Sequence, residues 1–217
     1  MSSKRRVTIA ILAALAGSGC GAPPKPLTPQ DAFRLTALAP LPADALAGSS
    51  VLLLPVGDLV LTDSAGVSPA LAARAWSLRG VAEAALDSAL KARAPGVVWL
   101  GLAEQQRALR MAPALGIEPA RLDTRYLLDP RITSMVDPLW SQLRALMGLT
   151  NARAALAPAG VLLDRRGTEY TAEYVLVLVD PRDGSVVGRG RTVGPAAATP
   201  EAALAAAALA TVPSTVH

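Results

Sequence analysis

The sequence is short of the residues that most often carry chemistry. A single cysteine among 217 residues excludes an intramolecular disulfide and a cysteine-based metal cluster, and the single histidine, His217, lies in a terminal segment. Aromatic residues make up 3% of the chain, which leaves few ring faces for stacking nucleic-acid bases. We therefore expect no metal site, no cofactor and no catalysis by His217, and we assign no catalytic residue.

Known catalytic motifs are also lacking. No G-x-S-x-G nucleophile turn occurs. The segment Gly188-Arg189-Gly190-Arg191 lacks the spacing of a phosphate-binding loop and lies in a predicted strand, where its arginines are expected on a solvated face. Asp180 and Asp183 flank Pro-Arg, which is ordinary turn chemistry. We expect a protein that is not an enzyme; a carboxylate-based hydrolase stays open, and would need a pocket with two or more convergent carboxylates.

What the chain does have is an export leader. Lys4, Arg5 and Arg6 precede the apolar run Val7–Ala16, which small residues and then Cys20 follow. This order of a basic, an apolar and a small-residue region predicts a signal peptide over residues 1–19. The apolar run has about half the ~20 residues that a spanning helix requires. Removal of residues 1–19 is therefore expected, after export by the general secretory route. Arg5-Arg6 leaves twin-arginine export as the alternative.

Cys20 at the end of this leader resembles the cysteine of a bacterial lipobox, which receives a diacylglyceryl group. Gly17 departs from that pattern, because an aliphatic residue usually stands three positions before the cysteine. The alternative is a plain secretory signal that leaves Cys20 as an unpaired thiol, a liability in an oxidising compartment. Gly21 stands where the resemblance places Asp in lipoproteins retained at the inner membrane. We expect lipidation at Cys20 and the periplasmic face of the outer membrane.

Processing changes the charge of the chain. The formal net charge is +4 and the pI is 9.7, but residues 1–19 hold three of the 21 basic residues and no acidic one. The mature chain then has a net charge near +1, without the basic surface that nucleic-acid binding requires. The expected partners are the membrane, through the lipid anchor, and another envelope protein, with no nucleic acid.

Proline divides the mature chain into a tether and a domain. Residues 20–50 contain Pro23, Pro24, Pro26, Pro29, Pro40 and Pro42, which favours an extended lipidated tether, although Ala32–Leu35 has the pattern of a segment that packs on the domain. Residues 51–212 are predicted to form that domain. Its expected elements are strand 51–54, a loop or short extension over 58–68, helix 69–94, strand 97–100, helix 103–111, helix 137–148, an extended segment 152–164 interrupted at 158–160, strand 169–180, strand 185–193 and helix 199–210.

The strand over residues 169–180 indicates the fold class. Ala172, Tyr174 and Leu176 point to one side and Val175 and Val177 to the other, so both faces need a cover. The predicted order gives an α/β fold, a mixed sheet with helices on both faces. It begins as β-α-β-α and ends as an antiparallel meander with a closing helix. Asp87 and Lys91, four residues apart on the long helix, are expected to pair.

Three segments resemble a bacterial envelope family, the domain shared by the curli-secretion lipoprotein CsgG and the penicillin-binding-protein activator LpoB, itself similar to the TolB amino-terminal domain. They are Val51–Val56 (VLLLPV), Ala103–Leu109 and Val175–Val187 (VLVLVDPRDGSVV). The resemblance covers about residues 51–193. It implies a tethered domain that binds another envelope component, and it transfers no contact residue. The long alternating hairpins of a CsgG pore are not visible here.

Two further groups of residues are candidates for contact. Arg165-Arg166 could dock an anionic partner, although a hairpin tip is the favoured interpretation. Trp76, Trp99 and Trp140 could line a ligand site, although core packing is favoured.

The predicted function is a non-enzymatic binding or scaffold module in cell-envelope assembly. The alternative is an accessory subunit of a secretion or transport complex that oligomerises through the sheet edge or its helices.

The anchoring prediction is tested at Cys20. In Cys20→Ala the acyl chains, which contribute about 0.8 kcal/mol per buried methylene, have no attachment point. We expect the variant to leave the membrane fraction while the wild-type chain stays in it. Fractionation of envelopes followed by mass spectrometry of the amino-terminal peptide measures both. Equal retention of the two chains would contradict lipid anchoring.

Overall fold

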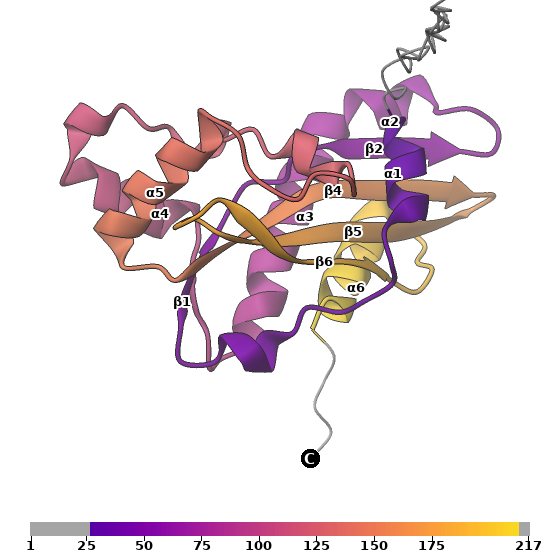
Figure 1. The fold of residues 1–217 in the computed structure, drawn as a ribbon. Coiled ribbons are helices and arrows are strands. Elements are labelled where there is room, and N and C mark those ends of the chain that lie inside the picture. Colours follow the sequence, from indigo (N-terminus) through magenta and orange to yellow (C-terminus); the bar gives the residue numbers. More distant parts are fainter. Residues whose placement is uncertain (1–26, 213–217) are drawn as a thin grey trace, which may run out of the picture.

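A computed structural model describes residues 27–212 of the chain, and its centre is one mixed sheet. The leader, Cys20 and His217 lie outside the described residues. The sheet runs in the order β3-β1-β4-β5-β6, and β2 pairs with β4 next to β1 (Figure 1). Its strands are β1 (Ser50–Leu53), β2 (Leu59–Asp63), β3 (Val98–Leu100), β4 (Ala154–Arg166), β5 (Glu169–Asp180) and β6 (Ser185–Val193). The contacts among β1, β2, β3 and β4 are parallel, and β4, β5 and β6 form an antiparallel meander.

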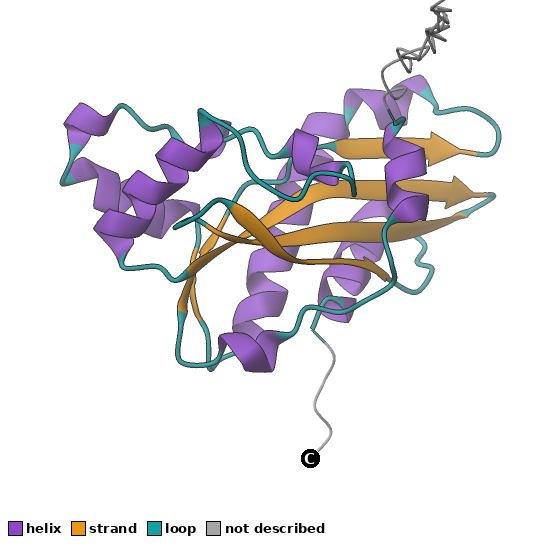
Figure 2. Cartoon of the chain, viewed as in Figure 1, coloured by secondary structure: helices purple, strands orange, loops and turns teal. Residues whose placement is uncertain are grey.

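Helices cover both faces of this sheet (Figure 2). They are α1 (Pro29–Leu35), α2 (Pro69–Ala73), α3 (Ala75–Arg93), α4 (Leu102–Arg110), α5 (Leu139–Thr150) and α6 (Pro200–Ala210). Side chains of α3 and α6 build the core on one face, and side chains of α1, α4 and α5 build it on the other. The predicted fold class is thereby confirmed, including the meander and the closing helix.

Strand β5 supplies residues to both cores. Tyr174 is fully buried on the α3 and α6 side, and its hydroxyl donates a hydrogen bond to the carbonyl oxygen of Ala82 over 3.0 Å. Burial raises the pKa of this hydroxyl far above its usual range, so it stays a donor at any ordinary pH. Val175, Val177 and Val179 are equally buried on the opposite side. The predicted division of this strand into two buried faces is correct.

Strand β2 lies in the segment 58–68, which the sequence presents as a loop or short extension. Its five residues are all half-buried, and they pair with the second half of β4, from Leu59 opposite Val161 to Asp63 opposite Arg165. This pairing follows a bulge at Pro158–Gly160, which bends β4 without ending it. The interruption predicted at 158–160 is therefore a bulge within one long strand.

Residues 28–49, placed by the sequence in the tether, pack on the domain. Thr28 caps α1, and Phe33 on that helix is 1% exposed. Gly160 makes room for it, because a β-carbon there would lie 3.1 Å from the Phe33 ring and 2.9 Å from Leu128. The pattern noted at Ala32–Leu35 thus marks a helix that covers the bulge of β4.

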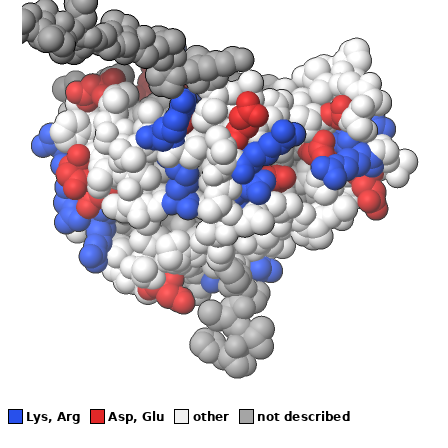
Figure 3. All heavy atoms as spheres, turned by 45° about the vertical axis from the view of Figure 1, so that its right-hand side comes forward, with Lys and Arg blue, Asp and Glu red and all other residues white. Residues whose placement is uncertain are grey.

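The surface carries mixed charge. All 17 acidic residues and 17 of the 21 basic residues fall within 27–212. Figure 3 shows the two signs interspersed over the face in view, with no large area of one sign. None of the helices within 27–212 combines the length and the apolar character that crossing a bilayer requires.

Phe33 is predicted to hold α1 in place. In Phe33→Ala the free energy of unfolding should fall by about 3 to 5 kcal/mol, because the ring leaves a cavity over Gly160. Leu35→Ala, two residues along the same helix at a side chain 62% exposed, should change it by less than about 0.5 kcal/mol. Urea unfolding of both variants gives the comparison. A loss at Phe33 no larger than at Leu35 would show that α1 does not support the fold.

Candidate functional site

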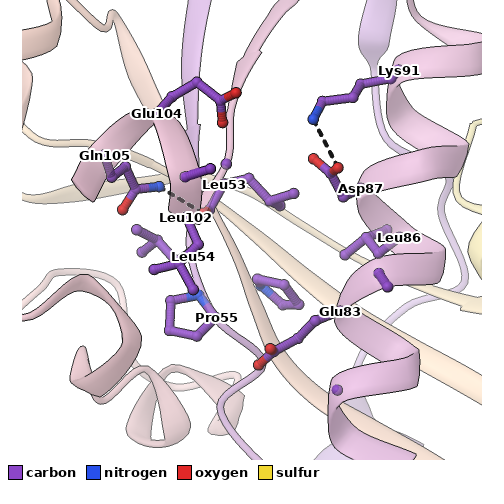
Figure 4. Close-up of a pocket in the computed structure, with 15 residues that line it drawn as sticks. Leu53, Leu54, Pro55, Glu83, Leu86, Asp87, Lys91, Leu102, Glu104 and Gln105 are labelled. Atoms are coloured by element: carbon purple, nitrogen blue, oxygen red, sulfur yellow. Dashed lines mark hydrogen bonds and ion pairs between the residues drawn. The ribbon is translucent and has the colours of Figure 1, made fainter. Parts of the chain in front are cut away.

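A hollow of about 340 Å³ opens beyond the carboxyl ends of the parallel strands β1 and β3 (Figure 4). The helices α3 and α4 flank it, and they cover opposite faces of the sheet. Strands whose neighbouring helices lie on opposite faces leave a crevice at their carboxyl ends, which is where open α/β sheets bind ligands. The topology therefore selects this hollow as the candidate site.

The walls of the hollow are mostly apolar. They are formed by the end of β1, by the inner face of α3 and by the first turn of α4, with side chains of Leu53, Leu54, Pro55, Leu86, Leu102 and Pro158. Leu102 is 42% exposed, although it is a large apolar residue. A hollow with apolar walls and few polar groups suits part of a ligand or of a partner protein.

Glu83 of α3 holds the chain where it leaves β1. Its Oε1 atom accepts a hydrogen bond from the backbone N–H of Val56 over 3.0 Å and lies 3.4 Å from Nε of Arg79. The strand β1 has ended at this point, so the N–H of Val56 needs a partner outside the sheet. Glu83 thus has a structural role at one side of the hollow.

Gln105 of α4 performs the same task for two carbonyl groups. Its Nε2 atom donates to the backbone oxygens of Leu53 and Leu100, each over 2.8 Å, which joins the ends of β1 and β3 to the helix. The side chain is fully buried. No sequence motif marks this residue. The available signal was its position in line with Leu102 and Leu109, three residues after one and four before the other, on the apolar side of α4.

Two carboxylates converge at the mouth of the hollow. Asp87 of α3 pairs with Lys91 through Oδ2 over 2.8 Å, as predicted, while its Oδ1 atom is buried and has no hydrogen-bond partner among the described residues. A β-carbon built on Gly101 would lie 3.2 Å from Oδ1 of Asp87 and 3.3 Å from Oε2 of Glu104. Figure 4 shows Glu104 on α4 and Asp87 on α3 at opposite sides of the hollow. The mouth can therefore accept hydrogen bonds from a donor group.

The three tryptophans do not form one site. Trp99 is buried and donates from Nε1 to the carbonyl oxygen of Ala94, and Trp140 packs on the core and donates to that of Pro181. Core packing is confirmed for these two. It is wrong for Trp76, which is 82% exposed at the start of α3, because its position turns away from Leu78 and Ala82, the residues that face the core.

The arginines of β6 are less solvated than predicted. Arg189 is half-buried and donates to the carbonyl oxygens of Leu127 and Ile132, and burial lowers its pKa. Arg191 pairs with Glu173 over 2.7 Å. The sequence places these side chains on a solvated face, but the chain around Leu127 and Ile132 covers that part of the strand.

The remaining candidates are turn residues. Arg165 lies 3.6 Å from Asp63, and Arg166 pairs with Asp164 over 2.8 Å, next to the tight turn at Gly167. This supports the hairpin-tip interpretation of Arg165-Arg166.

The turn between β5 and β6 is organised by its two acidic residues. Asp180 pairs with Arg182, and Asp183 accepts from the backbone N–H of Ser185. Hydrogen bonding to Arg182 lowers the pKa of Asp180. The turn interpretation of Asp180 and Asp183 is confirmed. Within 27–212, no three acidic, histidine or cysteine side chains gather as metal ligands would.

Gln105 is predicted to be the polar support of the hollow. In Gln105→Leu the carbonyl groups of Leu53 and Leu100 lose their side-chain donor, so the free energy of unfolding should fall by about 2 to 4 kcal/mol. The same change at the exposed neighbour, Gln106→Leu, should alter it by less than about 0.5 kcal/mol. Denaturant unfolding of both variants measures the difference. Equal losses would contradict the role of Gln105.

No protein-family model and no curated protein matches the sequence. Among solved structures, the chain is similar to the LpoB C-terminal domain from Salmonella enterica, with 13% identity, 68% of this chain and 83% of that chain covered, and a TM-score of 0.36. It is similar to lipoprotein GNA1162 from Neisseria meningitidis, with 16% identity, 67% and 81% covered and a TM-score of 0.33. It is also similar to the PelC dodecamer from Paraburkholderia phytofirmans, with 12% identity, 80% and 90% covered and a TM-score of 0.36. TM-scores this low carry no inference about function. The predicted resemblance to LpoB is confirmed only as a structural similarity, and the resemblance to CsgG stays a prediction.

Proposed function

We propose that the chain is a periplasmic lipoprotein, anchored in the outer membrane through Cys20, that acts as a non-enzymatic binding or scaffold module in cell-envelope assembly. The observation that carries the binding role is the hollow at the ends of β1 and β3, whose walls are mostly apolar and whose mouth holds Oδ1 of Asp87, a buried oxygen with no hydrogen-bond donor among the described residues. The leader that ends at Cys20 carries the location.

Binding rather than catalysis is favoured by what the polar groups of the hollow already do. Glu83 holds the N–H of Val56, Gln105 holds two carbonyl groups, and Asp87 pairs with Lys91. A general acid or base must exchange its proton with a substrate, which a fixed structural partner opposes. In Figure 4 no hydrogen bond or ion pair joins Glu104 to the other residues drawn, and its carboxylate is left to contact a ligand.

The occupant we propose is a segment of a partner protein that carries an apolar side chain and a basic group. The apolar part would lie against Leu54 and Leu102, and the basic group would meet Glu104 and the free Oδ1 atom of Asp87. Complementary charge at the rim of an interface selects the partner and speeds its approach more than it adds affinity.

Two other functions have a specific observation in their favour. The convergence of Asp87 and Glu104 at Gly101 meets the requirement set for a carboxylate-based hydrolase, which is the second candidate. An oligomerising accessory subunit could pair through its helices or through the sheet edge, and at the sheet edge β2 and β3 are the available strands, because β6 is already hydrogen-bonded to other segments of the chain. Sedimentation of the delipidated domain at micromolar concentration tests this alternative, and a monomer would count against it.

The binding role is tested by photocrosslinking in intact cells. A benzophenone amino acid at Leu102, in the mouth of the hollow, should give a discrete adduct with one envelope protein. The same amino acid at Leu115, equally exposed but outside the hollow, is the matched control and should give none. Adducts of the same pattern from both positions would contradict binding at the hollow.

Charge reversal adds a second arm to this experiment. Glu104→Lys should reduce the Leu102 adduct by about tenfold, because it turns the acidic mouth basic. Glu118→Lys reverses an exposed carboxylate that pairs with Arg121 elsewhere on the surface, and it should leave the adduct unchanged. An adduct that withstands Glu104→Lys would show that a basic group of the partner does not enter the hollow.

A further inference from the structure

We propose that the end of the domain which carries Trp76 and the first turn of α1 lies against the bilayer, with the indole ring of Trp76 among the lipid headgroups. The inference rests on the lipid anchor of the proposed function and adds an orientation to it. The occupant of this surface is the membrane itself, rather than a second protein.

The length of the chain before the domain carries the first step. Seven residue steps separate Cys20 from Leu27, the first described residue, and packing of the chain begins with the cap of α1 at Thr28. A fully extended chain spans at most about 3.6 Å per residue, so the anchor holds Leu27 within about 25 Å of the acylated sulfur. A tether of the whole length 20–50 would have left the orientation free, but the packed segment shortens it.

Contacts among side chains place Trp76 at the same end. Leu27 and Thr28 line a shallow hollow together with Asp123 and Arg125. The hydrogen bond from Arg125 lowers the pKa of Asp123, and the charge of Arg79 on α3 lies near enough to lower it further. The guanidinium of Arg79 in turn lies 5.9 Å from the centre of the Trp76 ring. The entry of the chain and Trp76 are thus joined by a short series of neighbours.

The ribbon agrees with this placement. In Figure 1 the chain enters at the upper end of α1, and α2 lies at the same upper end of the domain, on the other face of the sheet. Helix α2 leads through Arg74 directly into the first turn of α3, which bears Trp76. Helix α3 runs from this end of the domain to the lower end in Figure 1, and its last residue, Arg93, lies 17 residues, about 26 Å along the helix, beyond Trp76. There Arg93 donates a hydrogen bond to the carbonyl oxygen of Leu209 at the end of α6, a residue that is 40% exposed. Anchoring at Leu27 therefore turns Trp76 toward the membrane and Leu209 away from it.

The chemistry of Trp76 suits the headgroup region. Its ring is 82% exposed to solvent, and an indole joins an apolar body to an N–H donor, which is why tryptophan is enriched at membrane interfaces. Val67, in the loop before α2, is a second exposed apolar side chain. One ring adds little affinity alone, but the anchor makes its contact with the bilayer intramolecular, at a high effective concentration.

Charge does not select the lipid at this end. Arg74 pairs with Glu201, Arg79 with Glu83, and Arg125 with Asp123. Neutralised arginines give no net attraction to anionic headgroups. The contact should therefore form on phosphatidylethanolamine bilayers with either a low or a high content of phosphatidylglycerol.

The test is depth-dependent quenching of tryptophan fluorescence. The full lipidated chain is reconstituted in phosphatidylethanolamine and phosphatidylglycerol vesicles that contain a lipid with a nitroxide near the headgroup. We expect the nitroxide to quench the wild-type emission, and we expect Trp76→Phe to lose most of that quenching, because Trp99 is buried and Trp140 is half-buried against the core. The matched control, Trp76→Phe with Leu209→Trp, carries a partly exposed indole beside the opposite end of α3 and should show no quenching.

Lengthening the tether adds an independent arm. A flexible glycine-serine insert of about twenty residues between Pro26 and Leu27 should release the orientation and reduce quenching of Trp76 about twofold or more, without loss of vesicle binding. Quenching that the insert leaves unchanged would show that the anchor does not set the orientation, and would overturn the inference.

Failure of the inference and failure of the proposed function are distinguishable. A wild-type chain that binds vesicles through Cys20 but shows no quenching at Trp76, or equal quenching of the Leu209→Trp control, would overturn the orientation and leave the anchor intact. A wild-type chain that does not bind vesicles, or that binds no better than Cys20→Ala, would overturn the anchor and the orientation together.

Discussion

Burial of both faces of the central strands is the constraint on which the rest of the structure depends. Strand β5 carries Tyr174 on one face and Val175 on the other, and neither can meet water without a large loss of free energy. The helices α3 and α6 cover the first face. The second face exceeds what α4 and α5 cover, and α1 closes the remainder by placing Phe33 over the bulge of β4. Completing the core thus uses residues 28–49, which would otherwise serve as a spacer. With the anchor that we propose at Cys20, this packing would set how far the domain can lie from the membrane.

Helices on opposite faces of the sheet leave backbone groups without sheet partners at the place where α3 and α4 diverge. Backbone groups at the ends of β1 and β3 lie beyond the sheet ladder, and buried backbone groups need partners. Glu83 and Gln105 supply them from opposite sides, which leaves space between α3 and α4. Glu83 and Gln105, which hydrogen-bond these backbone groups, therefore also keep the hollow open. This is why a site on this fold can be stable and still accessible to a ligand.

Elements of this fold that follow from a local residue pattern can be predicted from the sequence, and those that depend on contact with a distant segment cannot. The two faces of β5 follow from alternation within one strand, and the helix caps at Ser68 and Thr199 follow from residue type. Strand β2 exists because Leu59–Asp63 meets β4, about a hundred residues later, and no local pattern records that pairing. Gln105 sits on an apolar helix face, where a polar residue is a signal, but its partners are backbone groups that sequence does not reveal. Trp76 reads as core by type, and its exposure depends on how α3 rotates against the sheet.

The free side of β6 is shared between two loops. At one end of the strand, the N–H of Ala39 donates to the carbonyl oxygen of Arg191, and the N–H of Arg191 donates to that of Ala37. At the other end, the N–H of Met135 donates to the carbonyl oxygen of Gly184, and the N–H of Val186 donates to that of Thr133. An uncovered strand margin is a template on which another polypeptide can add itself, and fibrous aggregates grow in this way. A protein concentrated on a two-dimensional surface meets its own copies far more often than one in dilution. For a chain anchored as we propose, the loops that cover both ends of β6 would let many copies share one leaflet without polymerising through this strand.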